Sequence, residues 1–270
     1  MAADSSHAAT GHRKKKETGM ETIKIEMSRN IATIRLDNGP TNAINLQVLK
    51  DLNAALDEIM SHGEAGACIL AAAGEKFFSI GFDLPELYDV KRDEFSVFYR
   101  SYNRFCLRLF TLPLPTIAEI GGHAVAGGCI LALCCDYRFI AKGRKLMGLN
   151  EVKLGVPVPY PASCILRDIA GVRRARELME TGEFHEPDAL LTMGLVDGVY
   201  TRAKLHPQAM AKAAALAGHP HMAWETIKRN RVAETEEEIN AKLADHEQRF
   251  IDLWYSEEAR KSLREAMDRY

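Results

Sequence analysis

The sequence lacks the features that mark disulfide-bonded, zinc-binding or membrane-spanning proteins. Its six cysteines lie in apolar stretches, without a Cys-x-x-Cys pair or a companion group of histidines. We therefore expect no disulfide framework and no metal site, and we predict reduced thiols packed in the core. The longest uncharged apolar stretch, residues 124–135, is far shorter than the roughly 18 residues that a membrane span needs.

An excess of one charge is also absent. Thirty-five Lys and Arg residues face 37 Asp and Glu residues, a net charge of -2, so no basic field favours nucleic acid or an anionic membrane. Residues 1–20 are polar and carry a basic run but no apolar segment, so we expect a flexible leader and no secretory signal. The carboxyl-terminal tripeptide is not a peroxisomal signal, and a cytoplasmic location is the default expectation.

The sequence does contain alternating strand and helix patterns. Apolar residues are 47% and charged residues 27%, close to the averages of soluble globular domains. Period-two and helical spacings of the apolar residues alternate along the chain, which predicts an α/β fold. The predicted strands are 23–27, 34–36, 67–71, 115–120, 138–141 and 196–200, and the predicted helices are 49–60, 95–109, 129–135 and 173–179.

Strand patterns stop near residue 205. Of the last 40 residues 18 are charged, yet Ile239, Leu243, Phe250 and Leu263 still recur at helical spacings. Such amphipathic helices need an apolar partner surface, which is either another subunit or the chain's own core. The predicted organisation is a leader at 1–20, an α/β core at 21–204 and a helical oligomerisation region at 205–270.

Three segments carry the chemically informative residues. Gly127 and Gly128 stand where a helix begins, so unpaired backbone N–H groups there suit an oxyanion, although the glycines could equally serve only close packing. Gly81, in a loop after another strand, would let the backbone approach a ligand. Glu151 stands among apolar neighbours that could perturb its pKa, although most glutamates are surface charges. The glycine spacing fits neither a P-loop nor a dinucleotide site.

In this order and spacing, these segments resemble the crotonase (enoyl-CoA hydratase/isomerase) superfamily. The Phe-Ser-Ile-Gly-Phe-Asp-Leu loop at 78–84 looks like the family's first oxyanion-hole loop, and Ala-Gly-Gly-Cys at 126–129 looks like its second. Segments 177–183 and 194–199 resemble later landmarks of the family. The resemblance spans roughly residues 22–200 and implies a spiral of ββα repeats followed by a helical trimerisation region.

The resemblance also implies a site for an acyl-CoA thioester. The backbone N–H groups of Phe82 and Gly127 would hold the thioester oxygen and stabilise an enolate, while their side chains are expected to matter little. Because amides hold the enolate, neither metal nor nicotinamide is expected, and coenzyme A is part of the substrate. The implied assembly is a homotrimer or hexamer, and the implied role lies in fatty acid metabolism. The implied substrate-binding residues are Ala43, Ser79, Ile80, Gly81, Asp83, Leu84 and Ile130.

The carboxylates point to one branch of the family. Hydratases of this family carry one glutamate three residues after the second oxyanion glycine, where this chain has Ile130, and another at the position of Glu151. A single base can move a proton from C2 to C4 of a 3-enoyl-CoA, which is the Δ3,Δ2-enoyl-CoA isomerase reaction. Segments 126–138 and 148–151 look most like mitochondrial-type isomerases. We expect Glu151 to rest ionised, with a pKa raised by its apolar pocket.

Some residues depart from the family pattern, and two other functions remain open. Glu119 in the strand before the glycine turn is either a buried structural acid or a second acid of the site, and His123 is either a turn residue or a proton carrier. Prolines follow Glu151 where a glycine-rich turn is usual, which reshapes the acyl pocket wall. The alternatives are another crotonase reaction on a CoA thioester, hydration included, and a non-catalytic acyl-CoA-binding protein.

Overall fold

The computed structural model describes residues 19–268, so the predicted leader lies almost wholly outside the described residues. A six-stranded sheet has the order β1-β2-β3-β5-β7-β10, and a four-stranded sheet has the order β4-β6-β8-β9. The strands of the large sheet are β1 (Ile23–Ser28), β2 (Ile31–Leu36), β3 (Ala67–Ala72), β5 (Thr116–Ile120), β7 (Tyr137–Ala141) and β10 (Gly198–Tyr200). Strands β1 and β2 form an antiparallel pair, and the other neighbours in this sheet run parallel.

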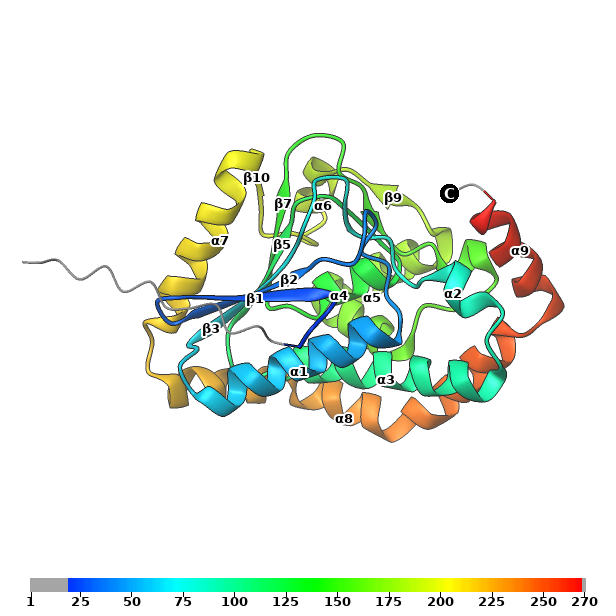
Figure 1. Ribbon diagram of the computed structural model, residues 1–270, viewed down its shortest axis with the longest axis horizontal. Coiled ribbons are helices and arrows are strands. Elements are labelled where there is room, and N and C mark those ends of the chain that lie inside the picture. Colours follow the sequence, from blue (N-terminus) through cyan, green and yellow to red (C-terminus); the bar gives the residue numbers. More distant parts are fainter. Residues whose placement is uncertain (1–18, 269–270) are drawn as a thin grey trace, which may run out of the picture.

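The large sheet is buried on both faces. Ile69 and Ile117 of its central strands pack with Leu205 and Ala209 of helix α7 (Arg202–Ala217), whereas Leu70 belongs to the main core on the opposite face. Figure 1 shows α7 on one side of this sheet and α4 and α5 on the other. Side chains alternate between faces along a strand, so these continuous apolar strands serve two cores at once.

The small sheet consists of short strands that the sequence patterns did not predict. They are β4 (Phe77–Ser79), β6 (His123–Val125), β8 (Met147–Gly148) and β9 (Phe184–His185). The glycine turn before Gly127 is therefore not a direct strand-to-helix connection, because β6 lies between β5 and the helix. Pairs β3/β4, β5/β6 and β7/β8 each place their first strand in the large sheet, place their second in the small sheet, and continue into helical structure. These are the expected ββα repeats.

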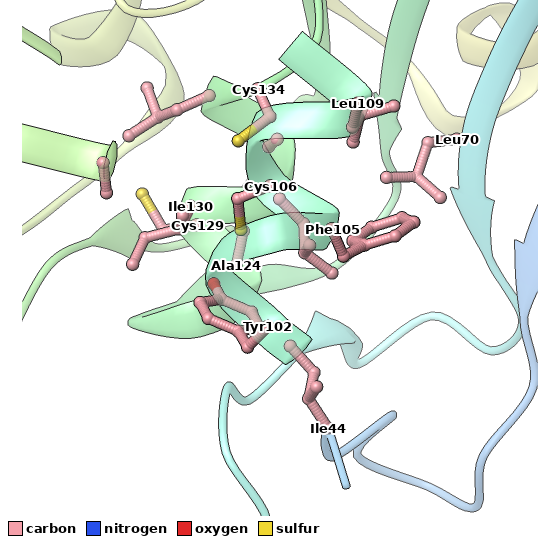
Figure 2. Close-up of a cluster of buried hydrophobic side chains, with 14 of the residues drawn as sticks. Ile44, Leu70, Tyr102, Phe105, Cys106, Leu109, Ala124, Cys129, Ile130 and Cys134 are labelled. Atoms are coloured by element: carbon pink, nitrogen blue, oxygen red, sulfur yellow. The ribbon is translucent and has the colours of Figure 1, made fainter. Parts of the chain in front are cut away.

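Helices enclose the small sheet and the inner face of the large one. Figure 2 shows Tyr102 and Cys106 of α3 beside Cys129 and Ile130 of α4. All six cysteines are free and buried, as predicted, and burial raises the pKa of the Cys68 thiol to about 12. The helices of this part are α1 (Leu46–His62), α2 (Leu84–Tyr88), α3 (Arg92–Phe110), α4 (Gly127–Leu133), the 3₁₀ helix η1 (Glu151–Leu154), α5 (Tyr160–Thr181) and α6 (Pro187–Thr192).

The carboxyl-terminal region is helical, as predicted, and packs on the chain's own core. Helix α8 (His221–Trp254) runs along α5 and α3, and α9 (Glu257–Met267) turns back to α2 and η1. The beginning of α8 is anchored by Lys228, which is 2% exposed and donates to Asp136 at 2.8 Å. The apolar faces of these helices therefore pack on the core of the same chain. A role of residues 205–270 in oligomerisation stays a prediction. Among residues 19–268, no helix has the length and apolarity to cross a membrane.

Candidate active site

The three predicted segments meet because each follows a strand of the small sheet. Strands β4, β6 and β8 are parallel neighbours, and Phe82, Gly127 and Glu151 follow their respective carboxyl ends. Parallel strands present their carboxyl ends at one edge of the sheet, which is where ligands bind in many α/β folds. Segments separated by more than 40 positions in the sequence, as Phe82 and Gly127 are, therefore line one cavity.

Hydrogen bonds in the first loop leave one backbone donor free. The N–H of Gly81 donates to the Ser79 hydroxyl at 3.1 Å, and that hydroxyl donates to the Asn42 carbonyl at 2.7 Å. The N–H groups of residues 80 and 83 also donate to backbone carbonyls. Within the described chain, the N–H of Phe82 donates no hydrogen bond. A free donor beside a cavity is what an oxyanion hole requires.

The second loop presents its donor through an unusual backbone. Ala126 has φ 46° and ψ -119°, a conformation that costs a non-glycine residue about 1–3 kcal/mol. It is held there because its N–H donates to the Gly148 carbonyl at 2.9 Å and its carbonyl accepts from Ile130 N–H at 3.0 Å. The next N–H, that of Gly127, is the first of α4 and donates no hydrogen bond within the described chain. This donor also lies at the positive end of a short helix.

The Phe82 side chain holds the loop in place. Its ring packs edge-on against Phe98 at 4.9 Å and Tyr102 at 4.8 Å between centroids. The Tyr102 hydroxyl in turn donates to the Gly127 carbonyl at 2.8 Å. Through Tyr102 this ring therefore links the two donor loops. The expectation that the Phe82 side chain matters little for the chemistry stays a prediction.

Glu151 has a buried carboxyl group, and one of its oxygens makes no hydrogen bond within the described chain. It is the first residue of η1, it is 5% exposed, and its Oε2 has no hydrogen-bond partner in the described chain. Burial raises the pKa of Glu151 to about 8, and a hydrogen bond from its own backbone N–H opposes this rise only in part. The direction of this pKa shift agrees with the prediction, and it favours the protonated form of Glu151. The ionised resting form stays a prediction.

These groups line a cavity of about 290 Å³. Its wall is mostly apolar, and its ionisable residues are Glu151 and Asp83, of which only Glu151 is buried. Asp83 accepts from the Glu86 N–H and so caps α2. The lining consists of Thr41, Ala43, Ile80, Phe82, Asp83, Leu84, Pro85, Val125, Ala126, Gly127, Ile130, Asn150, Glu151, Leu154, Val156, Pro159, Phe250, Trp254, Ala266 and Met267.

Most of the predicted substrate-binding residues lie in this wall. Ala43, Ile80, Asp83, Leu84 and Ile130 line the cavity. Ser79 and Gly81 do not, because they lie behind the wall and shape the first loop through the hydrogen bonds given above. Of the three prolines after Glu151, Pro159 lines the cavity, in agreement with the predicted change to the pocket wall.

Glu119 and His123 lie outside the cavity wall. Glu119 is 5% exposed, and its carboxylate is 2.7 Å from Nδ1 of His206 on α7, on the far side of the large sheet. His123 accepts from the Leu146 N–H at 2.9 Å through Nδ1, and burial lowers its pKa. Both contacts support the structural interpretations of these residues.

Sequence reasoning missed the contribution of the carboxyl-terminal helices. Phe250 and Trp254 of α8 and Ala266 and Met267 of α9 complete the wall. Phe250 was recognised only as part of an amphipathic pattern, which does not say what the apolar face covers. Asn150 was also missed as a lining residue, and its Oδ1 has no partner in the described chain.

Comparisons with known proteins agree with this geometry. The model of the enoyl-CoA hydratase/isomerase family matches residues 26–270. The chain belongs to that family. The mouse protein "Enoyl-CoA delta isomerase 1, mitochondrial" is 29% identical over 216 residues, covering 78% of this chain and 75% of the relative. The short-chain-enoyl-CoA hydratase of Clostridium acetobutylicum is 31% identical over 187 residues, covering 69% of this chain and 71% of the relative.

The fold of a solved family member is also close. The crystal structure of human mitochondrial delta3-delta2-enoyl-CoA isomerase superposes with a TM-score of 0.89 at 26% identity, covering 92% of this chain and 98% of the other. The predicted crotonase fold is thereby confirmed. Relatives named isomerase and relatives named hydratase both match, so membership of the family does not by itself choose between the two reactions.

Proposed function

We propose that this enzyme is a Δ3,Δ2-enoyl-CoA isomerase that uses Glu151 as its only acid and base. The observation that carries the proposal is the composition of the cavity wall. Among the described residues that line it, Glu151 has the one buried carboxyl group, and Ile130, 1% exposed, stands where hydratases of the family carry a second. Isomerisation needs one proton carrier, whereas hydration also needs a group that activates water.

The proposed reaction moves one proton and one double bond. The Glu151 carboxylate removes a proton from C2 of the 3-enoyl-CoA, and the C–H electron pair passes into a dienolate whose charge rests on the thioester oxygen. The N–H groups of Phe82 and Gly127 stabilise this oxygen, and loss of one such donor typically costs about 10²–10³ in rate. The protonated Glu151 then returns the proton to C4, which leaves the double bond between C2 and C3 and regenerates the carboxylate.

The raised pKa of Glu151 suits this shuttle. The carboxylate of an acid with a pKa of about 8 is a stronger base than an exposed glutamate, and its protonated form holds the proton readily between the two steps. Because the raised pKa of Glu151 favours the protonated form and the carboxylate is the base, turnover should increase as pH increases toward 8.

Hydration of 2-enoyl-CoA is the competing reaction, favoured by the relatives that are named hydratases. Both reactions can be followed by ultraviolet absorbance, because conjugated 2-enoyl-CoA forms in one and disappears in the other. We expect the enzyme to isomerise 3-hexenoyl-CoA and to leave 2-hexenoyl-CoA unhydrated. Hydration faster than isomerisation would overturn the assignment, and inactivity toward both substrates would favour a non-catalytic acyl-CoA-binding protein.

We also make proposals about the cofactor requirement, the assembly state, the cellular location and the metabolic role of this enzyme. Backbone donors and one carboxyl group suffice for the chemistry, so we propose no cofactor beyond the coenzyme A of the substrate, and activity should survive treatment with a chelator. The homotrimer or hexamer, the cytoplasmic location and the role in fatty acid metabolism are also proposals. Sedimentation tests the assembly, and cell fractionation tests the location against the mitochondria that appear in the names of several relatives.

A further inference from the structure

The cavity has an open end and a closed end. Near the first loop Thr41, Leu84 and Pro85 are partly or fully exposed, so this end is the entrance. At the other end Ile130, Phe250 and Trp254 are each no more than 2% exposed. A thioester held by Phe82 and Gly127 therefore directs its coenzyme A portion toward the entrance and its acyl chain toward the closed end.

Two aromatic side chains of α8 form the closed end, and other rings support them from behind. Trp254 stacks on Phe95 with 4.3 Å between ring centroids, and Phe250 stacks on Tyr99 at 4.0 Å. Phe95 and Tyr99 both belong to α3, and both are buried in the core. Because these rings fill the space behind Phe250 and Trp254, a change of rotamer in either residue would not lengthen the cavity.

Further contacts fix the carboxyl end of α8, where Trp254 lies. Tyr255, the residue after Trp254, donates through its hydroxyl to the Val90 carbonyl at 2.9 Å. The Arg260 guanidinium of α9 lies 3.2 Å from the ring centre of Tyr88 in α2. These contacts tie α8 and α9 to the segment that follows the first oxyanion loop, and they hold Trp254 in place.

We propose that Trp254 is the residue that limits acyl chain length, so that the enzyme acts on uncharged acyl-CoA thioesters no longer than octanoyl-CoA. At about 290 Å³ the cavity lies at the lower limit of small-molecule sites, which measure roughly 300–1,000 Å³. The thioester and the carbons that react take up part of this space, so we place the limit on the acyl chain between octanoyl and dodecanoyl. This inference rests on the proposed function, because it assumes an acyl-CoA in this cavity.

The charge of the wall excludes a second class of substrate. Among the described residues that line the cavity there is no lysine or arginine, and the one buried carboxyl group is that of Glu151. An acyl chain that ends in a carboxylate would lose its hydration without gaining a cationic partner. Dicarboxylic acyl-CoA thioesters are therefore rejected together with long chains.

The first test measures binding and does not depend on turnover. Butanoyl-, octanoyl- and dodecanoyl-CoA, which cannot isomerise, are titrated calorimetrically into wild type, Trp254→Ala and the control Leu253→Ala, whose side chain is 43% exposed on the same helix. We expect wild type and the control to bind dodecanoyl-CoA at least ~10-fold more weakly than octanoyl-CoA, since each poorly accommodated methylene costs about that factor. Trp254→Ala should abolish this difference.

Equal binding of dodecanoyl- and octanoyl-CoA by wild type would overturn the proposal, as would an unchanged ratio in Trp254→Ala. If the alanine variant does not fold, Trp254→Phe is measured in its place. Its preference for octanoyl-CoA over dodecanoyl-CoA should be smaller than that of wild type, because the smaller ring lengthens the cavity. A wild type that discriminates by length but isomerises no 3-enoyl-CoA would sink the proposed function and leave this inference intact.

Fluorescence provides an independent readout. The chain has two tryptophans, and Trp224 lies near the other end of α8. In a Trp224→Phe background, Trp254 emission should change when octanoyl-CoA binds and stay unchanged with coenzyme A alone. Identical responses to the two ligands would show that the acyl chain does not reach this ring, and would contradict the assignment.

Discussion

Gly128 lies against Ser79 so closely that a Cβ atom on the glycine would be 2.3 Å from the Ser79 carbonyl oxygen. This contact joins the second oxyanion loop to the first at the level of the backbone. Gly128→Ala should therefore separate the two loops and reduce kcat by about 10–10³-fold, because both N–H donors must face one oxygen. Steady-state kinetics with 3-hexenoyl-CoA measure the effect.

Gly218→Ala is the matched control for this substitution. Gly218 has φ -77°, and its nearest neighbour to an added Cβ lies at 3.4 Å. It should retain wild-type kinetics. A Gly128→Ala enzyme as active as this control would mean that the loops tolerate separation and that the hole does not depend on their contact.

The pH dependence of kcat/KM follows from Glu151. Burial raises the pKa of this carboxyl group to about 8, and the carboxylate is the form that removes the proton. Activity should therefore increase about tenfold for each pH unit below 8 and level off above it. A profile that is flat from pH 5 to 9 would contradict the role of a buried glutamic acid with this pKa.

Substitution of Glu119 tests whether the reaction uses one carboxyl group, that of Glu151, or two. Its carboxylate lies 2.7 Å from His206 and outside the cavity wall, so Glu119→Gln should keep the rate of isomerisation and affect mainly stability. Kinetics and thermal unfolding of the same preparation separate the two effects. Loss of activity in a fully folded Glu119→Gln enzyme would support the alternative in which this residue acts as a second acid.

The ion pair of Asp136 and Lys228 should contribute to stability without contributing to catalysis. Both side chains are at most 6% exposed, and burial lowers the pKa of Lys228 despite the neighbouring carboxylate. Asp136→Ala leaves the ammonium group buried and poorly compensated, so we expect a loss of about 3–5 kcal/mol in the free energy of unfolding. Urea denaturation measures it.

Asp57→Ala serves as the comparison for that loss. The Asp57 side chain is 71% exposed and pairs with Arg108 at the surface, where removing an ion pair costs at most about 1 kcal/mol. If the two variants lose the same free energy of unfolding, burial of the Asp136–Lys228 pair does not increase its contribution to stability.

The long elements of the fold were predictable because their apolar periodicity is strong. The predicted helix at 49–60 is the central part of α1, and the predicted strand at 67–71 is β3 with one residue missing. The small sheet was not predictable from periodicity, because strands such as Met147–Gly148 are too short to show an alternation. Their pairing depends on contacts between distant segments.

The site was predictable where the chemistry is local in sequence. Glu151 and the free donors of Phe82 and Gly127 lie where the family motifs indicated. The closed end of the cavity was not predictable, since Phe250 and Trp254 stand about 100 positions after Glu151 in helices whose pattern fits several partners. Only the packing of α8 along α3 and α5 brings them to the cavity wall.

The most direct test of the central claim compares wild type with Glu151→Gln, which keeps the size of the side chain and removes the base. We expect the variant to lose at least ~10²-fold in the rate of 3-hexenoyl-CoA isomerisation and to bind octanoyl-CoA as tightly as wild type does. Isomerisation by Glu151→Gln at the wild-type rate would contradict it, because no other buried carboxyl group lines the described cavity.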